Sequence, residues 1–180
     1  MEYRSIADIY EANNKIHGKF HAVVSALAAD QALALAEEEK WSVAQIVEHV
    51  SLVEGGIVRI CSRLISKAEA AGQMSSGALD LSEFMQKADG ITDVKLEAPE
   101  VVHPVNGRSI ANSLEVMEEN GRAFDELRPR LEKFDCNAHK FPHPYLGDLS
   151  ALEWLTLAGG HKIRHLRQIK RVLEKMGSGA

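Results

Sequence analysis

The sequence predicts an all-α fold, a four-helix bundle with a long connection between its second and third helices. Four segments repeat apolar residues at steps of three and four, the spacing that places them on one face of an α-helix. No stretch of useful length alternates apolar and polar residues with a period of two, so strands are not expected. Long amphipathic helices must bury their apolar faces against one another, and a bundle does this.

The first two helices are predicted over residues 5–29 and 42–71. The apolar face of the first consists of Ile6, Ile9, Tyr10, Ile16, Phe20, Val23, Val24 and Leu27. The second begins where Ser42 and Gln45 have capping-box spacing, in which each side chain bonds the backbone N–H of the other residue. The glycine pair at 55–56 weakens this helix and indicates close packing.

Residues 72–105 are predicted to form the long connection, with at most a short helix at 81–88. Glycine and proline interrupt this segment at Gly72, Gly77, Gly90, Pro99 and Pro104. The third helix follows from Ile110, with its apolar residues again on one face. Because proline lacks a backbone N–H and its ring clashes with the preceding turn, Pro129 is expected to kink this helix or end it near Leu127.

A proline- and glycine-containing loop is predicted over residues 135–148, before the last helix. Ser150 and Glu153 repeat the capping-box spacing and mark where that helix begins. Residues 1–176 are expected to form a single domain, because a chain of 180 residues suits one compact core. Residues 177–180, with the sequence Gly-Ser-Gly-Ala, are expected to be a disordered tail.

Composition excludes several classes of partner. The formal net charge is −5 and the pI is about 5.9, and no face carries a run of Lys and Arg, so neither nucleic acid nor an anionic membrane is expected to bind. No apolar stretch reaches the roughly 20 residues that span a bilayer, and the N-terminus is too polar for a secretory signal. These features predict a cytoplasmic protein. Cys61, in an apolar stripe, and Cys136, in a polar connection, are expected to be free thiols.

Three histidines form the candidate functional site. His161 and His165 are four residues apart, close to the centre of the apolar stripe of the last helix, so both imidazoles should point into the bundle. His49 lies near the apolar stripe of the second helix and should face a neighbouring helix. A lone histidine on such a face is more often a hydrogen-bonded core residue than a ligand. Two stacked core histidines are harder to satisfy in that way, and a metal ion would satisfy all three.

Other residues near these histidines have less defined roles. His17 could approach the site from the first helix, but a partner carbonyl at the edge of the core is the better expectation. His143 and Tyr145 could line the mouth of the site or simply pack there. Glu48 should be a solvated surface charge, because adjacent helical residues diverge by about 100°. Gln168, near His165, is a candidate hydrogen-bond partner of a ligand. No residue is identified as a general acid or base.

The motifs that carry these histidines resemble the DinB-like superfamily of metal-binding four-helix bundles. The matching motifs are Trp41-Ser42-x-x-Gln45-x-x-x-His49, His143-Pro144-x-x-Gly147-x-Leu149-Ser150-x-x-Glu153-Trp154, and His161-x-x-x-His165-x-x-Gln168. The resemblance implies that His49, His161 and His165 hold one divalent metal ion such as Zn, Ni or Mn. The connection at residues 72–105 matches no motif of that family.

The resemblance also implies a class of function. It suggests a metal-dependent enzyme, a transferase that uses a small cellular thiol or a hydrolase, because three imidazole ligands leave a coordination position open. The partner would then be a small-molecule substrate, including a low-molecular-weight thiol, and a homodimer is compatible with the family. One alternative is a nonenzymatic, stress-related metal-binding or regulatory bundle. Another is a helical interaction protein with no metal, in which the histidines are hydrogen-bonded core residues.

Overall fold

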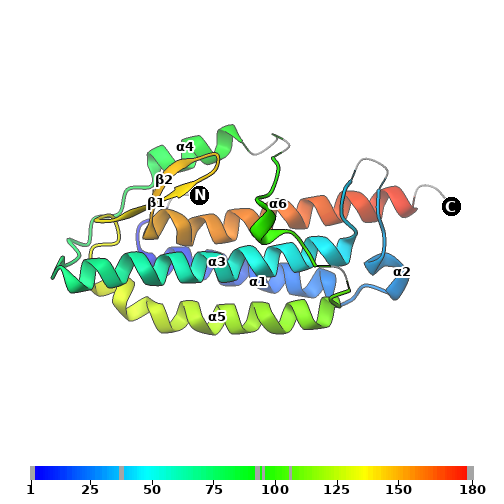
Figure 1. Cartoon of the computed structure of the whole chain (residues 1–180), viewed down its shortest axis with the longest axis horizontal. Coiled ribbons are helices and arrows are strands. Elements are labelled where there is room, and N and C mark those ends of the chain that lie inside the picture. The colour runs from blue at the N-terminus through cyan, green and yellow to red at the C-terminus, as the bar shows by residue number, and fades with distance from the viewer. Residues whose placement is uncertain (1–2, 37–38, 92–93, 95, 106, 178–180) are drawn as a thin grey trace.

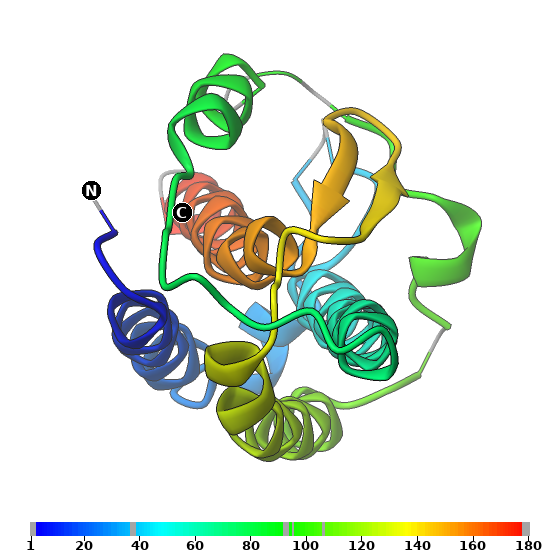
Figure 2. The ribbon, with the colours of Figure 1, turned by 90° about the vertical axis from the view of Figure 1, so that its left-hand side faces the viewer.

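Four long helices lie side by side and form a bundle. They are α1 (Ile6–Val24), α3 (Val43–Ala70), α5 (Ile110–Lys133) and α6 (Ala151–Gly177). Their axes follow the long dimension of the molecule (Figure 1). Seen from the end, α6 packs against α1 and α3, and α5 packs against α3, whereas α1 and α5 make few contacts with each other (Figure 2). The predicted helical bundle is therefore confirmed.

The structure is a computed structural model that describes residues 3–36, 39–91, 94, 96–105 and 107–177. Within these residues, no helix is long and apolar enough to cross a membrane.

The predicted helix starts agree with the structure. Ser42 and Gln45 form the capping box at the start of α3, each accepting a hydrogen bond from the backbone N–H of the other. Ser150 and Glu153 do the same at the start of α6. At the glycine pair within α3, a Cβ on Gly55 would lie 3.1 Å from Oδ1 of Asn120, which confirms close packing against α5.

Two predicted helix ends were wrong. α1 ends at Val24, and a separate short helix α2 (Ala29–Ala32) follows it. α5 continues through Pro129 to Lys133, because Leu131, in its last turn, is fully buried in the core and holds that turn against the bundle. α6 ends at Gly177, one residue beyond the predicted Met176, and residues 178–180 of the predicted tail lie outside the described residues.

The prediction that the chain forms no strands was also wrong, because the loop before α6 contains a small hairpin. Strands β1 (Lys140–His143) and β2 (Gly147–Ser150) pair antiparallel, with His143 opposite Gly147. Gly147 has φ +77°, a backbone conformation that glycine adopts without strain. The indole N–H of Trp154 donates to the carbonyl of Phe141, so α6 itself fixes the hairpin. Strands this short leave too little sequence for a period of two to be visible.

The long connection contains helix α4 (Ser82–Gly90) and a single 3₁₀ turn, η1 (Glu100–Val102). Residues 96–105, which we call the covering segment, are fixed by contacts from other elements. Tyr145 donates its hydroxyl proton to the carbonyl of Glu97, and Glu48 accepts the backbone N–H of Val105.

The core is divided into two apolar clusters along the bundle axis. One is centred on residues such as Ile9, Ile57 and Leu155, and the other on residues such as Phe20, Ile46 and Ile169. Polar side chains separate the two clusters at mid-bundle: Asn13, His17, Ser51, Glu54, Asn120 and Lys162.

Candidate metal centre

The three predicted ligands come from two neighbouring helices that pack closely. His49 lies in the second turn of α3, seven residues after its cap at Ser42. His161 and His165 lie one turn apart in the middle of α6. Because α3 and α6 share an extensive contact, one imidazole from α3 meets two from α6.

The structure brings the three imidazoles together. Nε2 of His161 lies 3.3 Å from Nε2 of His49 and 3.1 Å from Nε2 of His165. One nitrogen from each ring falls within 4.8 Å of the other two, so the group could hold a metal ion. His49 and His165 are 3% and 8% exposed, which keeps their rings away from bulk water.

A hydrogen bond from the covering segment fixes the proton on His49. Nδ1 of His49 lies 2.8 Å from the carbonyl oxygen of Val102. A carbonyl oxygen only accepts, so Nδ1 carries the proton and donates it. In the neutral ring the other nitrogen, Nε2, is then an unprotonated electron-pair donor that faces His161.

A two-step chain fixes His165 in the same way. The side-chain amide of Gln168 donates through Nε2 to the carboxylate of Glu39 at 2.6 Å, which leaves its oxygen facing His165. Nδ1 of His165 therefore donates to Oε1 of Gln168 at 2.7 Å. Nε2 of the neutral His165 ring is again unprotonated. Such outer partners of metal ligands orient the ring and raise its basicity.

With protons on Nδ1 of His49 and of His165, a cation is the group that best fits between the three Nε2 atoms. Nε2 of His161 lies within 3.3 Å of two unprotonated nitrogens, and it has at most one proton to offer. The group therefore holds more electron pairs than hydrogens. Two nitrogens bound tetrahedrally to one zinc ion at 2.0–2.1 Å stand about 3.3 Å apart. The donor set and its spacing fit a divalent ion.

Burial keeps the three rings neutral. It lowers the pKa of His49, and it lowers the pKa of His165 to about 3, with the charge of His49 adding to the effect. The pKa of His161 falls well below its usual value, first through burial and then through the neighbouring imidazoles. Neutral imidazoles are the form that binds metals, so the ligands are available at neutral pH.

Aromatic rings form a wall beside His49. The ring of Trp41 lies 4.8 Å from that of His49, and His103 meets Trp41 edge-on at 5.6 Å. This wall and the carbonyl of Val102 cover the α3 side of the group. Its polar contacts are thereby shielded from water, which strengthens electrostatic interactions.

His143 and Tyr145 lie in the hairpin rather than in the histidine group. Nδ1 of His143 accepts the backbone N–H groups of Tyr145 and Leu146, so its Nε2 carries a proton in the neutral ring. The ring of His143 lies 5.3 Å from that of Trp154 in the first turn of α6.

Two sequence-based interpretations of neighbouring residues were wrong. Glu48 is 1% exposed rather than solvated, and its carboxylate accepts the N–H of Val105. His17 neither reaches the three histidines nor bonds a carbonyl, because its Nε2 lies 2.9 Å from Glu118 on α5. Sequence reasoning missed Glu39 and Val102, which lie outside the long helices and reveal no role by their spacing.

The chain resembles known proteins over most of its length. Residues 14–169 match the family model described as the DinB superfamily. The uncharacterized protein YuaE of Bacillus subtilis (strain 168) is 22% identical over 143 residues, covering 77% of this chain and 80% of its own length. No solved structure matches the chain significantly.

Proposed function

Because the chain belongs to the DinB superfamily, we propose that His49, His161 and His165 bind one divalent metal ion and that the site carries out metal-dependent chemistry on a small molecule. One observation carries the proposal. Two unprotonated Nε2 atoms face a third within 3.3 Å, an arrangement that a cation satisfies.

The ligand set favours catalysis over a closed structural site. Among the described residues the group that could hold a metal consists of three histidines alone. Three imidazoles leave a position for water or substrate, whereas structural zinc sites use four protein ligands. When bound there, the ion would supply Lewis acidity, which lowers the pKa of a coordinated water or thiol. We propose that the reaction is transfer to a low-molecular-weight thiol or hydrolysis.

The chain's own residues hold the site rigid and supply a proton donor near it. Val102 and Gln168 fix the orientation of His49 and His165, so the ligands need not reorganise during a reaction. The protonated Nε2 of neutral His143 can donate a hydrogen bond to an oxygen of the substrate. Its low pKa, caused by burial, keeps His143 neutral at pH 7.

Metal analysis of untagged protein, purified without metal columns, tests the proposal. We expect near one equivalent of a divalent metal in the parent protein and a loss of metal in a His161→Ala His165→Ala variant. His143→Ala is the matched control, since it removes a nearby histidine outside the ligand set, and it should retain the metal. No metal in the parent, or equal metal in parent and double variant, would contradict it. The metal found reflects availability as well as preference, because affinity alone favours Cu²⁺ and Ni²⁺.

A second candidate function is a nonenzymatic metal-binding bundle. The covering segment favours it, because the carbonyl of Val102 lies against His49 and closes one side of the site to a substrate. Removing the metal with a chelator separates the two. An enzyme loses a thiol-consuming or hydrolytic reaction that returns with added metal. A binding protein shows only a lower melting temperature, because an ion that binds the folded state alone stabilises it.

A further inference from the structure

A second polar centre lies on the inner side of α6. Lys162 follows His161 directly, so its side chain leaves the helix about 100° away from the imidazole. The lysine is 3% exposed and points between α1, α3 and α5, where it lies in the polar layer that divides the core. Buried ammonium groups need partners, and this layer supplies them.

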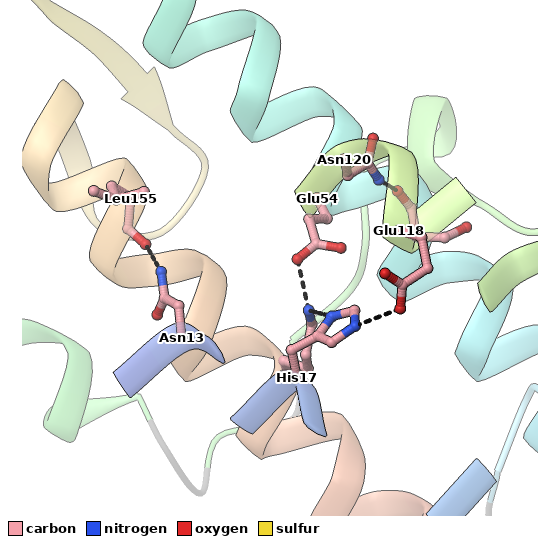
Figure 3. A network of polar contacts seen from close by, with 8 residues as sticks. Asn13, His17, Glu54, Glu118, Asn120 and Leu155 are labelled. Carbon is pink, nitrogen blue, oxygen red and sulfur yellow. Dashed lines mark hydrogen bonds and ion pairs between the residues drawn. The ribbon is translucent and has the colours of Figure 1, made fainter. Parts of the chain in front are cut away.

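Lys162 belongs to a chain of hydrogen bonds that crosses the bundle from α3 to α5. Figure 3 labels Glu54, His17 and Glu118 along this chain. Its Nζ donates to Oε1 of Glu54 at 2.6 Å and to Nδ1 of His17 at 3.1 Å. An ammonium group only donates, so Nδ1 of His17 accepts and its Nε2 carries the proton. That proton is donated to Glu118 at 2.9 Å.

Within this chain of hydrogen bonds, one acceptor of Glu54 and one donor of Lys162 have no partner among the described residues. Oε2 of Glu54 is buried and accepts no hydrogen bond, although the residue is only 7% exposed. Lys162 has three N–H groups and uses two, and among the described residues nothing accepts the third. A buried carboxylate oxygen without a donor is costly, which indicates a missing partner.

A cavity of about 170 Å³ adjoins these groups. Residues of α1, α3, α5 and α6 line it, and two hydrogen bonds lie between its lining residues. At one end the hydroxyl of Tyr10 donates to the carbonyl of Phe124, and at the other His17 donates to Glu118. Between them, Gly121 lines the opening, and a Cβ there would contact nothing within 4 Å.

We propose that this cavity binds a small neutral molecule that carries a primary amide or a hydroxyl group. Such a group donates to Oε2 of Glu54 and accepts from Nζ of Lys162, both of which line the cavity. The volume compares with the roughly 150 Å³ cavity known to hold a benzene-sized molecule, so a ligand of about five or six heavy atoms fits.

The hydrogen-bonding characters of Glu54 and Lys162 select the ligand. A ligand carboxylate has no proton to donate to Oε2 of Glu54, and a ligand ammonium has no lone pair to accept from Nζ of Lys162. Only a group that both donates and accepts matches the pair. This site is separate from the three histidines, none of which lines the cavity.

Nuclear magnetic resonance titration of the full chain with propionamide tests the proposal. We expect saturable shifts of the backbone amide signals of Asn13, Glu54 and Lys162. Propylamine and propionate have nearly the same size but only one of the two hydrogen-bonding characters, and each should shift these signals at least tenfold less at equal concentration. No saturable shift with propionamide would mean that the cavity holds only solvent. Equal binding of all three would mean that Glu54 and Lys162 do not select the ligand, and either result would overturn the proposal.

A Gly121→Leu variant tests the location. The new side chain would enter the opening without a backbone clash, and should abolish the propionamide shifts. Gly18→Leu is the matched control, because Gly18 is an exposed helical glycine with nothing within 4 Å of its Cβ position and does not line the cavity. Shifts that persist unchanged in Gly121→Leu, or that centre on His161 and His165, would contradict the proposed site. If Gly121→Leu does not fold, the comparison of the three probes in the parent still decides.

Discussion

The carboxylate of Glu39 accepts a 2.6 Å hydrogen bond from the side-chain amide of Gln168, which lies 129 positions further along the chain. This contact decides which end of the amide faces His165. A segment before α3 thereby determines the proton position on a candidate ligand of α6, without touching that ligand itself.

A Gln168→Ala variant should therefore bind its metal about 10- to 100-fold more weakly than the parent, because His165 loses the acceptor for its Nδ1 proton. The affinity is measured by competition with a chelator of known strength. Arg171→Ala, an exposed position on the same helix, is the control and should leave the affinity unchanged. Equal affinities of parent and Gln168→Ala would show that the orientation of His165 does not depend on this contact.

Gly159→Ala should lower the free energy of unfolding by about 1–3 kcal/mol, the usual cost of overpacking. The new Cβ would lie 2.2 Å from Oδ1 of Asn13, and Asn13 cannot move without losing its bond to the carbonyl of Leu155. Urea denaturation measures the change.

The neighbouring Gly160 provides the control for this substitution. A Cβ there meets nothing within 4 Å, so Gly160→Ala should stabilise the helix by about 0.5–1 kcal/mol. In an Asn13→Ala background the cost of Gly159→Ala should disappear. A cost that persists there would mean that Asn13 is not the source of the clash.

The metal-free protein should lose stability in acid. Burial holds the pKa values of His49, His161 and His165 below 6.5 in the folded state, with that of His165 at about 3, whereas the unfolded chain binds protons near pH 6.5. As the pH falls below 6.5, the unfolded state takes up protons that the folded state does not. The free energy of unfolding then falls by about 1.4 kcal/mol per pH unit for each such histidine.

Denaturation at pH 7, 6 and 5 after chelation measures this slope. A His165→Gln variant should show a shallower slope, since one of the neutral imidazoles is gone. Identical slopes for parent and variant would place the acid sensitivity elsewhere in the chain.

Neither cysteine should react with Ellman's reagent in the folded protein at pH 8. Cys61 is 0% and Cys136 6% exposed, and burial raises the pKa of both thiols, that of Cys136 to about 12. In guanidinium chloride both should react and give two equivalents per chain. Rapid reaction of one thiol without denaturant would reveal local opening around it.

The helices and the three histidines could be predicted because helical spacing alone puts residues on a common face. His161 and His165 share a helix, so their proximity follows from the sequence, and only the approach of His49 required the fold. Prediction failed where a distant contact decides the outcome. Pro129 was expected to kink α5 or to end it near Leu127, but α5 does not end there, because burial of Leu131 keeps the last turn of α5 in the helix.

Glu48 shows the same limit on the face of a helix. Its position beside His49 predicted a solvated carboxylate, because helical geometry turns it away from the histidine. The covering segment folds back over that face and buries it, and the N–H of Val105 becomes its partner. Burial by a loop leaves no periodic signal, so neither this contact nor the one from Val102 to His49 could be read from spacing.

His161 and Lys162 are consecutive residues whose side chains leave α6 about 100° apart, one into the histidine group and the other into the polar layer of the core. Any rigid rotation of α6 about its axis therefore displaces the imidazole and the ammonium group together, by the same angle. A partner that fixes one of them also removes torsional freedom from the other. A substitution that changes only the rotation of α6 about its axis would therefore disturb both the histidine group and the hydrogen bonds of Lys162.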